Sequence, residues 1–172
     1  MFRSDHYADY DYAIGVLALG DPVKLAELEQ LLDGFPDGED NFLGNPWIIN
    51  AIACGSQTSI KWMLSRGVEL AFPVRDGYTV LHLALERQES DKYEVIELLL
   101  QYGAPVNAHG INDWTPAHMA AVGEDIEALK LVMQYGADLS IRTGIDDYAT
   151  PLEEARRLNS TRAVQFLENL AE

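Results

Sequence analysis

The chain has 172 residues, of which 48% are hydrophobic, 9% aromatic and 23% charged. Twelve Lys and Arg residues stand against 28 Asp and Glu residues, so the formal net charge at pH 7 is −16. This length suits one domain with a sizeable core, and the hydrophobic content argues against a wholly disordered chain. The acidic balance argues against nucleic acid and anionic membranes as partners, because both require clustered Lys or Arg.

The N-terminal segment argues against a secretory signal or a membrane span. Residues 1–12 read MFRSDHYADYDY and lack the cationic start of a signal peptide. The apolar stretch 13–19 is about one third of the length that a membrane helix needs. One cysteine, Cys54, excludes an internal disulfide and fits a reducing compartment. We therefore expect a cytoplasmic protein.

Two short patterns recur along the chain at nearly the same period. The segments DGYTVLHLAL, NDWTPAHMAA and DYATPLEEAR align on Thr79, Thr115 and Thr150, which are 36 and 35 residues apart. A glycine that follows an apolar run recurs at Gly67, Gly103 and Gly136, with spacings of 36 and 33 residues. Two independent signals of similar period predict a repeat architecture. The predicted units are approximately 8–40, 41–75, 76–111, 112–146 and 147–172.

The first two units carry the pattern weakly. In the first, only Ala18, the Gly20-Asp21 pair and the run LEQLLDG at 28–34 follow it. The second keeps Ala51 and a final glycine. The segment 35–46, FPDGEDNFLGNP, is rich in turn residues and too long for a minimal hairpin, so we expect the first unit to pack irregularly.

The third and fourth units each predict a helix–turn–helix. Thr115 is a good N-cap, Pro116 suits the first helical position, and Gly136 is a typical C′ residue. The third unit has about three extra residues around 88–90, which predicts a longer turn between its helices. Because one such helix pair cannot bury its apolar face alone, the units are expected to stack, with the first and the fifth as caps.

The best-kept unit resembles the ankyrin repeat. The resemblance rests on Thr115, Pro116, His118, Ala120 and Ala121, on the run 99–104 that ends in Gly-Ala, and on 106–108. It implies an all-α ankyrin-repeat solenoid of about five helix–turn–helix units with short β-hairpin-like fingers, in a single domain over 1–172. It also implies that His82 and His118, at equivalent motif positions, form structural hydrogen bonds to the neighbouring unit.

Nothing in the sequence indicates an enzyme, a cofactor or a metal site. His6 and His109 have no partner at metal-ligand spacing, and Cys54 is expected to pack in the interior. The acidic segment 37–41 lacks the alternating ligands of a calcium loop, so we interpret it as a solvated acidic loop. A Cys–His catalytic pair stays a remote alternative.

Aromatic and charged residues near the expected fingers predict a partner-binding surface. Tyr78 and Trp114 directly precede the motif Thr, and Tyr148 lies two residues before its Thr. Trp and Tyr are favoured interface residues, although the alternative that they only pad the stack stays open. The predicted partner-binding residues, on the fingers and the groove face of the first helices, are Arg75, Asp76, Tyr78, His109, Ile111, Asn112, Trp114, Met119, Val122, Arg142, Ile145, Asp146 and Tyr148.

We therefore predict a non-catalytic protein–protein interaction module that is monomeric on its own and binds a partner with a basic surface. The net charge has two interpretations, solubility or steering of that partner. A second hypothesis is an acidic inhibitor or immunity protein, similar to an antitoxin, that neutralises a basic enzyme or toxin. An adaptor would capture scaffold or receptor proteins, whereas an inhibitor would abolish the activity of one basic enzyme.

Overall fold

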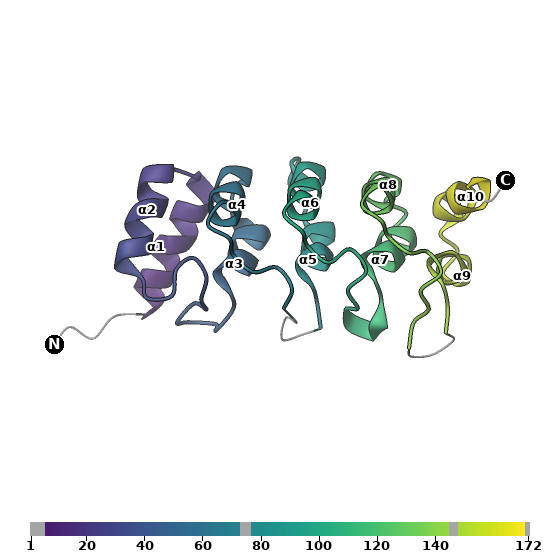
Figure 1. The fold of residues 1–172 in the computed structure, drawn as a ribbon, viewed down its shortest axis with the longest axis horizontal. Coiled ribbons are helices and arrows are strands. Elements are labelled where there is room, and N and C mark those ends of the chain that lie inside the picture. Colours follow the sequence, from purple (N-terminus) through teal and green to yellow (C-terminus); the bar gives the residue numbers. More distant parts are fainter. Residues whose placement is uncertain (1–5, 73–76, 145–147, 171–172) are drawn as a thin grey trace. The chain divides into compact units, whose positions relative to one another are not determined.

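The computed structural model describes residues 6–72, 77–144 and 148–170. Within these residues the chain forms ten α-helices and one short 3-10 helix, and no strand (Figure 1). The helices follow one another as five packed pairs, each joined by a short turn. The predicted all-α class of helix–turn–helix units is confirmed. By its contacts the chain divides into an N-terminal unit, Met1–Glu69, and a C-terminal unit, Leu70–Glu172.

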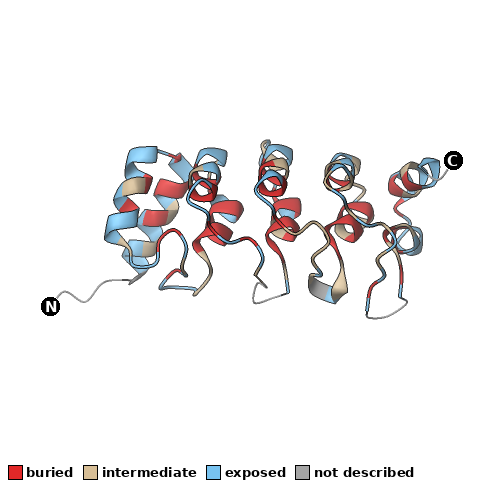
Figure 2. Ribbon diagram, viewed as in Figure 1, coloured by how far each residue is buried: buried red, intermediate tan, exposed pale blue. Residues whose placement is uncertain are grey.

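The N-terminal unit contains two helix pairs. Its helices are α1 (His6–Leu19), α2 (Pro22–Leu31), α3 (Trp47–Cys54) and α4 (Gln57–Leu64). Helix α1 packs against α2 and α3, and α2 packs against α4. Leu17, Leu25 and Ile52 are fully buried between them, while the outer faces of α1 and α2 are exposed (Figure 2). The first predicted repeat unit thus forms a helix pair as the others do, and its first helix, with 14 residues, is the longest described.

The loop that precedes α3 is held by a buried carboxylate. Asp40 is only 2% exposed and accepts hydrogen bonds from the backbone N–H groups of residues 42–45 and, at 2.9 Å, from the Asn50 side chain. Burial raises the pKa of Asp40, but the hydrogen bonds from the Asn50 amide and the backbone lower it by more. The net pKa therefore lies below its ordinary value. The interpretation of 37–41 as a solvated loop is therefore wrong for Asp40.

The prediction that Cys54 packs in the interior is also wrong. Cys54 is the last residue of α3 and is exposed. Its thiol donates to the carbonyl oxygen of Asn50, 3.0 Å away, one helical turn earlier. The apolar face of α3 is carried instead by residues such as Ile48 and Ile52, both fully buried.

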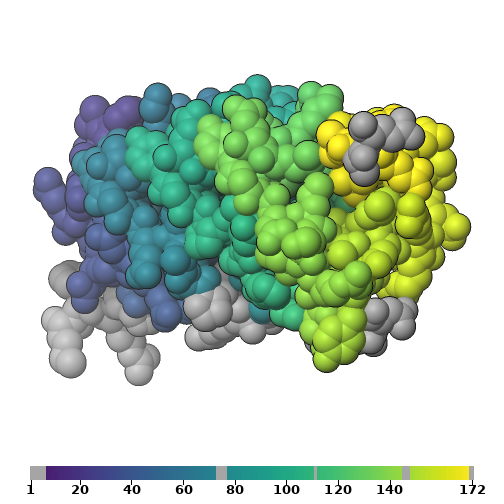
Figure 3. All heavy atoms as spheres, turned by 45° about the vertical axis from the view of Figure 1, so that its right-hand side comes forward, coloured from purple at the N-terminus to yellow at the C-terminus, as the bar shows by residue number. Residues whose placement is uncertain are grey.

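The C-terminal unit contains three helix pairs in two layers. Its elements are α5 (Val80–Glu86), α6 (Lys92–Gln101), η1 (Ile111–Asp113), α7 (Pro116–Val122), α8 (Ile126–Gln134), α9 (Pro151–Arg157) and α10 (Thr161–Asn169). The first helices α5, α7 and α9 pack in one row, and the second helices α6, α8 and α10 pack in another. In space-filling form the α9–α10 pair, drawn in yellow, lies directly against the preceding segments (Figure 3).

The predicted start and stop signals of these helices are confirmed. Thr79, Thr115 and Thr150 are the N-cap residues of α5, α7 and α9, and Pro116 begins α7. Gly136, which follows α8, has a φ of 89°, a conformation that only glycine adopts without steric cost. Local chemistry within four residues therefore sets the helix boundaries.

The third predicted unit has the longer turn expected from its extra residues. Five residues, 87–91, separate α5 from α6, whereas three residues separate α7 from α8. The side chain of Arg87 is only 2% exposed and forms a bidentate ion pair with Asp91, at 2.8 and 3.1 Å. This ion pair, in which the Arg87 side chain is buried and Asp91 is half-buried, gives the longer turn a defined shape.

His82 connects its helix pair to the loop that follows. We call the loops 104–115 and 137–150 fingers. The Nε2 atom of His82 lies 3.0 Å from the carbonyl oxygen of Trp114, and Nδ1 lies 2.7 Å from the Thr79 hydroxyl. Because a carbonyl only accepts, Nε2 carries the proton and Nδ1 accepts from the hydroxyl. Burial lowers the pKa of His82 to about 4, so this neutral form persists at pH 7.

His118 repeats the same arrangement one unit later. Its Nε2 atom lies 3.0 Å from the carbonyl oxygen of Ala149, and its Nδ1 atom accepts from the Thr115 N–H at 3.2 Å. Burial also lowers the pKa of His118. The structural hydrogen bonds predicted for the two motif histidines are therefore present.

Candidate functional site

A hollow on the first helices of the C-terminal unit collects three of the predicted binding residues. We call this cavity of about 330 Å³ the inner hollow. Its lining comes from α5, the start of α6, α7 and the turns beside α7, and consists of Leu85, Lys92, Trp114, Met119, Ala120, Val122, Gly123 and Asp125. Trp114, Met119 and Val122 are the predicted residues that meet here.

The helix α7 aims its larger side chains at this hollow because its small residues face the core. Ala117, Ala120 and Ala121 are at most 1% exposed and pack against the neighbouring helices. Met119 and Val122 lie three residues apart on the other face and are half-buried. The wall of the inner hollow is therefore mainly apolar, and its two charged residues, Lys92 and Asp125, form an ion pair 2.7 Å long.

Trp114 is held in place through its backbone. Its carbonyl oxygen accepts from His82, and a second bond at 2.7 Å joins the same oxygen to the Gly110 N–H. A side chain at Gly110 would collide with the His82 ring, since a Cβ there would lie 2.6 Å from Cε1. These contacts fix the residue while its indole stays half-buried in the wall of the hollow.

Several other predicted residues lie in loops of the C-terminal unit but do not line the inner hollow. The Tyr78 hydroxyl donates to Glu86 at 3.2 Å, and the ring meets His82 edge-on, with centroids 6.1 Å apart. His109 is exposed and its Nδ1 lies 2.7 Å from an Asp113 carboxylate oxygen. Asn112 is exposed.

Arg142 is paired within the chain. Its guanidinium forms two bonds to the Glu153 carboxylate, at 2.7 and 3.1 Å, and donates to the Tyr148 carbonyl oxygen at 2.5 Å. Ile111 belongs to η1. The remaining predicted residues fall outside the described part of the chain, namely Arg75, Asp76, Ile145 and Asp146.

Tyr148 has an unfavourable backbone conformation for a tyrosine. The residue two positions before the motif Thr has a positive φ in three units, with 75° at Gly77, 61° at Asp113 and 50° at Tyr148. Glycine adopts this region freely and Asp tolerates it, but a bulky side chain pays a steric cost. Tyr148 is 63% exposed, so packing of its side chain inside the protein offsets little of that steric cost.

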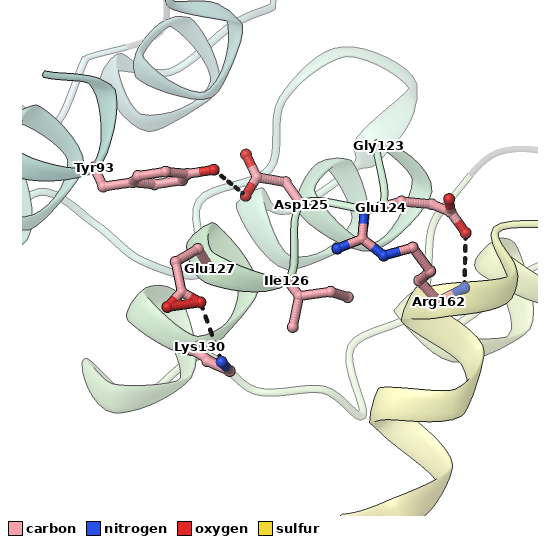
Figure 4. A pocket seen from close by; sticks show the side chains of 8 residues that line it. All are labelled: Tyr93, Gly123, Glu124, Asp125, Ile126, Glu127, Lys130 and Arg162. Atoms are coloured by element: carbon pink, nitrogen blue, oxygen red, sulfur yellow. Dashed lines mark hydrogen bonds and ion pairs between the residues drawn. The ribbon is translucent and has the colours of Figure 1, made fainter. Parts of the chain in front are cut away.

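A second cavity, of about 470 Å³, lies over the second helices, and we call it the outer hollow (Figure 4). Its lining residues come from α6, α8, α10 and the α7–α8 turn, and are Tyr93, Gly123, Glu124, Asp125, Ile126, Glu127, Lys130 and Arg162. A third cavity, the side hollow of about 350 Å³, continues between α6 and α8 and is lined by Tyr93, Glu94, Glu97, Glu127, Lys130, Leu131 and Gln134.

Asp125 organises the boundary between the inner and outer hollows. Its carboxylate pairs with Lys92 and accepts from the Tyr93 hydroxyl at 3.1 Å and from the Ala128 N–H at 3.1 Å. Burial raises the pKa of Asp125, but Lys92 and the backbone donor lower it, so the net pKa lies below its ordinary value. Burial and the Asp125 charge raise the pKa of Tyr93.

A family profile described as "Ankyrin repeats (many copies)" matches residues 88–132. The putative E3 ubiquitin-protein ligase XBAT34 of Arabidopsis thaliana is 34% identical over 112 residues, 64% of this chain and 29% of that protein. RelA-associated inhibitor of Mus musculus is 33% identical over 107 residues, 62% and 12% of the two chains. Ankyrin repeat and SOCS box protein 16 of Homo sapiens is 30% identical over 105 residues, which are 61% of this chain and 22% of that protein. The chain is an ankyrin-repeat protein.

This ankyrin-repeat protein spans less than one third of the length of each of those relatives. Ankyrin repeats are protein–protein interaction modules and are generally non-catalytic. Within the described residues, no group of three His, Cys, Asp or Glu side chains has a geometry that could hold a metal ion. None of the described helices has the length and apolar character needed to cross a membrane.

The sequence analysis did not predict the outer and side hollows. Their walls come from the outward faces of second helices, where polar residues are expected on any solvated helix. Tyr93 was the one usable signal, because an aromatic residue among Glu94 and Glu97 is unusual on such a face. Its contact with Asp125 joins positions 32 residues apart and follows only from the stacking of α6 on α8.

Proposed function

We propose that this ankyrin-repeat protein is a non-catalytic module that holds a segment of a partner protein in the inner hollow. The observation that carries the proposal is the convergence of Trp114, Met119 and Val122 on one cavity. An aromatic side chain in a concave apolar wall is typical of the residues that dominate binding energy at interfaces. The five predicted units form the scaffold of this module.

The charge supports a partner with a basic surface. Residues 112–149 carry seven acids and two bases, a balance of −5, and the whole chain carries −16. Such a field accelerates the approach of a basic protein and weakens as salt is added. The predicted fingertip residues, Arg75 and Asp76 on one loop and Ile145 and Asp146 on another, would extend the contact beyond the hollow. We place the protein in the cytoplasm as a monomer.

A second candidate function is an acidic inhibitor that neutralises a basic enzyme or toxin. Two observations favour it, the high negative charge and the relative that is named an inhibitor. A pulldown from the source cell followed by activity assays separates the two candidates. Loss of activity of one basic enzyme would identify an inhibitor, whereas a set of scaffold or receptor proteins would identify an adaptor.

Binding kinetics against the captured partner test the main proposal. Trp114→Ala is expected to raise the dissociation rate and cost about 2 kcal/mol or more, as the loss of an anchor residue does. Tyr102→Ala is the matched control. Tyr102 is another aromatic residue of the C-terminal unit, is 46% exposed, and lines none of the three hollows. Equal effects of the two variants would contradict a binding role for the inner hollow.

Asp146→Asn combined with Asp147→Asn tests the role of charge separately. This pair is expected to slow association at low salt, with little change in dissociation, and the difference should vanish at physiological salt. An association rate that does not change with salt would assign the negative charge to solubility alone. The proposal that the inner hollow binds the partner would then still stand.

A further inference from the structure

The three hollows of the C-terminal unit adjoin one another. The inner and outer hollows share Gly123 and Asp125, and the outer and side hollows share Tyr93, Glu127 and Lys130. Together they lead from the first-helix layer, past the α7–α8 turn, to the surface between α6 and α8. We propose that one partner segment follows this whole path, with its apolar anchor in the inner hollow and Lys or Arg side chains in the side hollow. This inference rests on the proposed function of the inner hollow.

The chemistry of the walls changes along the path. The inner hollow is lined mainly by apolar residues such as Trp114 and Met119, and its two charged residues, Lys92 and Asp125, pair with each other. The outer and side hollows together are lined by five carboxylates against two cations, a balance of −3 that becomes −2 when Lys92, the ion-pair partner of Asp125, is included. A segment with a bulky apolar residue at one end and positive charge at the other therefore complements the path from end to end.

The negative charge is least compensated in the side hollow. Glu94 and Glu97 form no ion pair with any described residue, whereas Glu127 pairs with Lys130 at 3.1 Å. Glu94 and Glu97 lie three residues apart on α6, so their like charges repel each other. A cation from a partner would relieve that repulsion and also reach the Tyr93 ring between the two hollows.

The inner and outer hollows meet at Gly123 and Asp125, which line both. The Asp125 carboxylate accepts from the Tyr93 hydroxyl (Figure 4) and pairs with Lys92, and these contacts fix the start of α6 against the start of α8. Gly123, the other shared residue, is exposed and has no side chain to obstruct a crossing chain. The occupant is an extended segment, because a straight helix about 10–12 Å wide cannot bend around a turn from one layer to the other.

Selection of random 16-residue peptides displayed on phage tests the proposal without knowledge of the natural partner. The full chain is immobilised, and the best peptides are synthesised and titrated by fluorescence anisotropy. We expect the selected sequences to share an aromatic or large aliphatic residue and, several positions away on one side, Lys or Arg. Trp114→Ala and Met119→Ala should each weaken binding, and the second variant guards against misfolding of the first.

The double variant Glu94→Gln, Glu97→Gln should weaken the same peptides about three- to tenfold at low salt, since two exposed ion pairs are lost. Asp9→Asn, Asp11→Asn is the matched control, because it changes the net charge equally on exposed positions of α1, and it should change affinity less than about twofold. If peptide binding depends on Trp114 but both double variants change the affinity equally, the extended path is wrong. The proposal that the inner hollow binds the partner would then still stand. Peptides that bind independently of Trp114 and Met119 would overturn both.

Discussion

The two units hold their helix pairs together by different means. In the C-terminal unit, His82 and His118 each reach from a first helix to the carbonyl oxygen of the next finger. In the N-terminal unit, the Ser59 hydroxyl donates to the Leu17 carbonyl oxygen at 2.6 Å, and aromatic rings join the loop between the helix pairs to α3 and α4. Phe35 meets Trp47 edge-on at 5.5 Å between centroids and stacks on Trp62 at 5.9 Å.

This difference determines how local damage should spread. A histidine bond joins consecutive repeats, so its loss weakens two helix pairs at once, as expected for nearest-neighbour coupling in repeat proteins. The aromatic cluster instead joins the loop 32–46 to α3 and α4 within the N-terminal unit. Arg66 covers one end of the cluster, with its guanidinium 3.4 Å from the centre of the Trp62 ring.

The largest expected effect comes from breaking the aromatic cluster. Trp47 is 3% exposed and contacts the rings of Tyr10 and Phe35. Trp47→Ala should lower the free energy of unfolding by about 3–5 kcal/mol, because it leaves a large cavity. Urea unfolding measures the loss. Val23→Ala, at a residue that is 68% exposed in the same unit, is the control and should change stability little.

The histidine bonds predict a pH dependence that the aromatic cluster lacks. The pKa of His82 is about 4 in the folded chain and about 6.5 when unfolded, so between these values the unfolded state binds the extra proton. The contribution of His82 is therefore complete above pH 6.5 and falls by roughly 3 kcal/mol as the pH drops to 4.

Urea unfolding of the native chain and of His82→Asn at pH 7.5, 6, 5 and 4 isolates this dependence, because the carboxylates titrate in both. The native chain is more stable at pH 7.5, and the gap should narrow as the pH falls. A gap that stays constant from pH 7.5 to 4 would contradict the assignment of a buried neutral ring.

A smaller effect is expected at the loop that precedes α3. Asp40→Asn places an amide against backbone donors that now face a carboxylate, so it should cost about 1–3 kcal/mol. Amide hydrogen exchange should accelerate at residues 42–45. Unchanged protection there would show that the carboxylate does not hold the loop. Asp37→Asn, at an exposed residue of the neighbouring turn, is the control.

The smallest effect has the opposite sign. Tyr148→Gly removes the steric cost of a positive φ and should raise stability by about 0.5–1 kcal/mol, while Tyr148→Ala keeps that cost and should not. Both variants lose the exposed ring and should bind the partner more weakly. Thermal unfolding together with binding kinetics checks both halves. A Gly variant that binds as well as the native chain would remove Tyr148 from the interface.

Features with local causes could be predicted from the sequence. The N-cap at Thr115, Pro116 at the first helical position and the C′ glycine at Gly136 act within a few residues, so their pattern along the chain is sufficient. The shared register of the repeats also predicts that Trp114, Met119 and Val122 lie on one face, and all three line one cavity.

Features that depend on long-range packing could not be predicted from the sequence. The burial of Asp40 follows from how the loop 40–45 folds around its carboxylate, and composition alone made it look like one more solvated acid. The outer hollow depends on Tyr93 meeting Asp125 across two stacked repeats. Tyr78 shares the motif register of Trp114 and Tyr148 lies one position earlier, yet the described part of the chain places neither in the lining of the inner hollow.

Hydrogen exchange of the chain with and without its captured partner is the most direct test of the binding site. The binding proposal predicts slower exchange on complex formation in residues 114–125, which contain Trp114 and form the α7 wall of the inner hollow. The N-terminal helices α1 to α4 should exchange as before. Protection confined to 6–64, with residues 114–125 unchanged, would contradict the assignment and place the partner on the N-terminal unit instead.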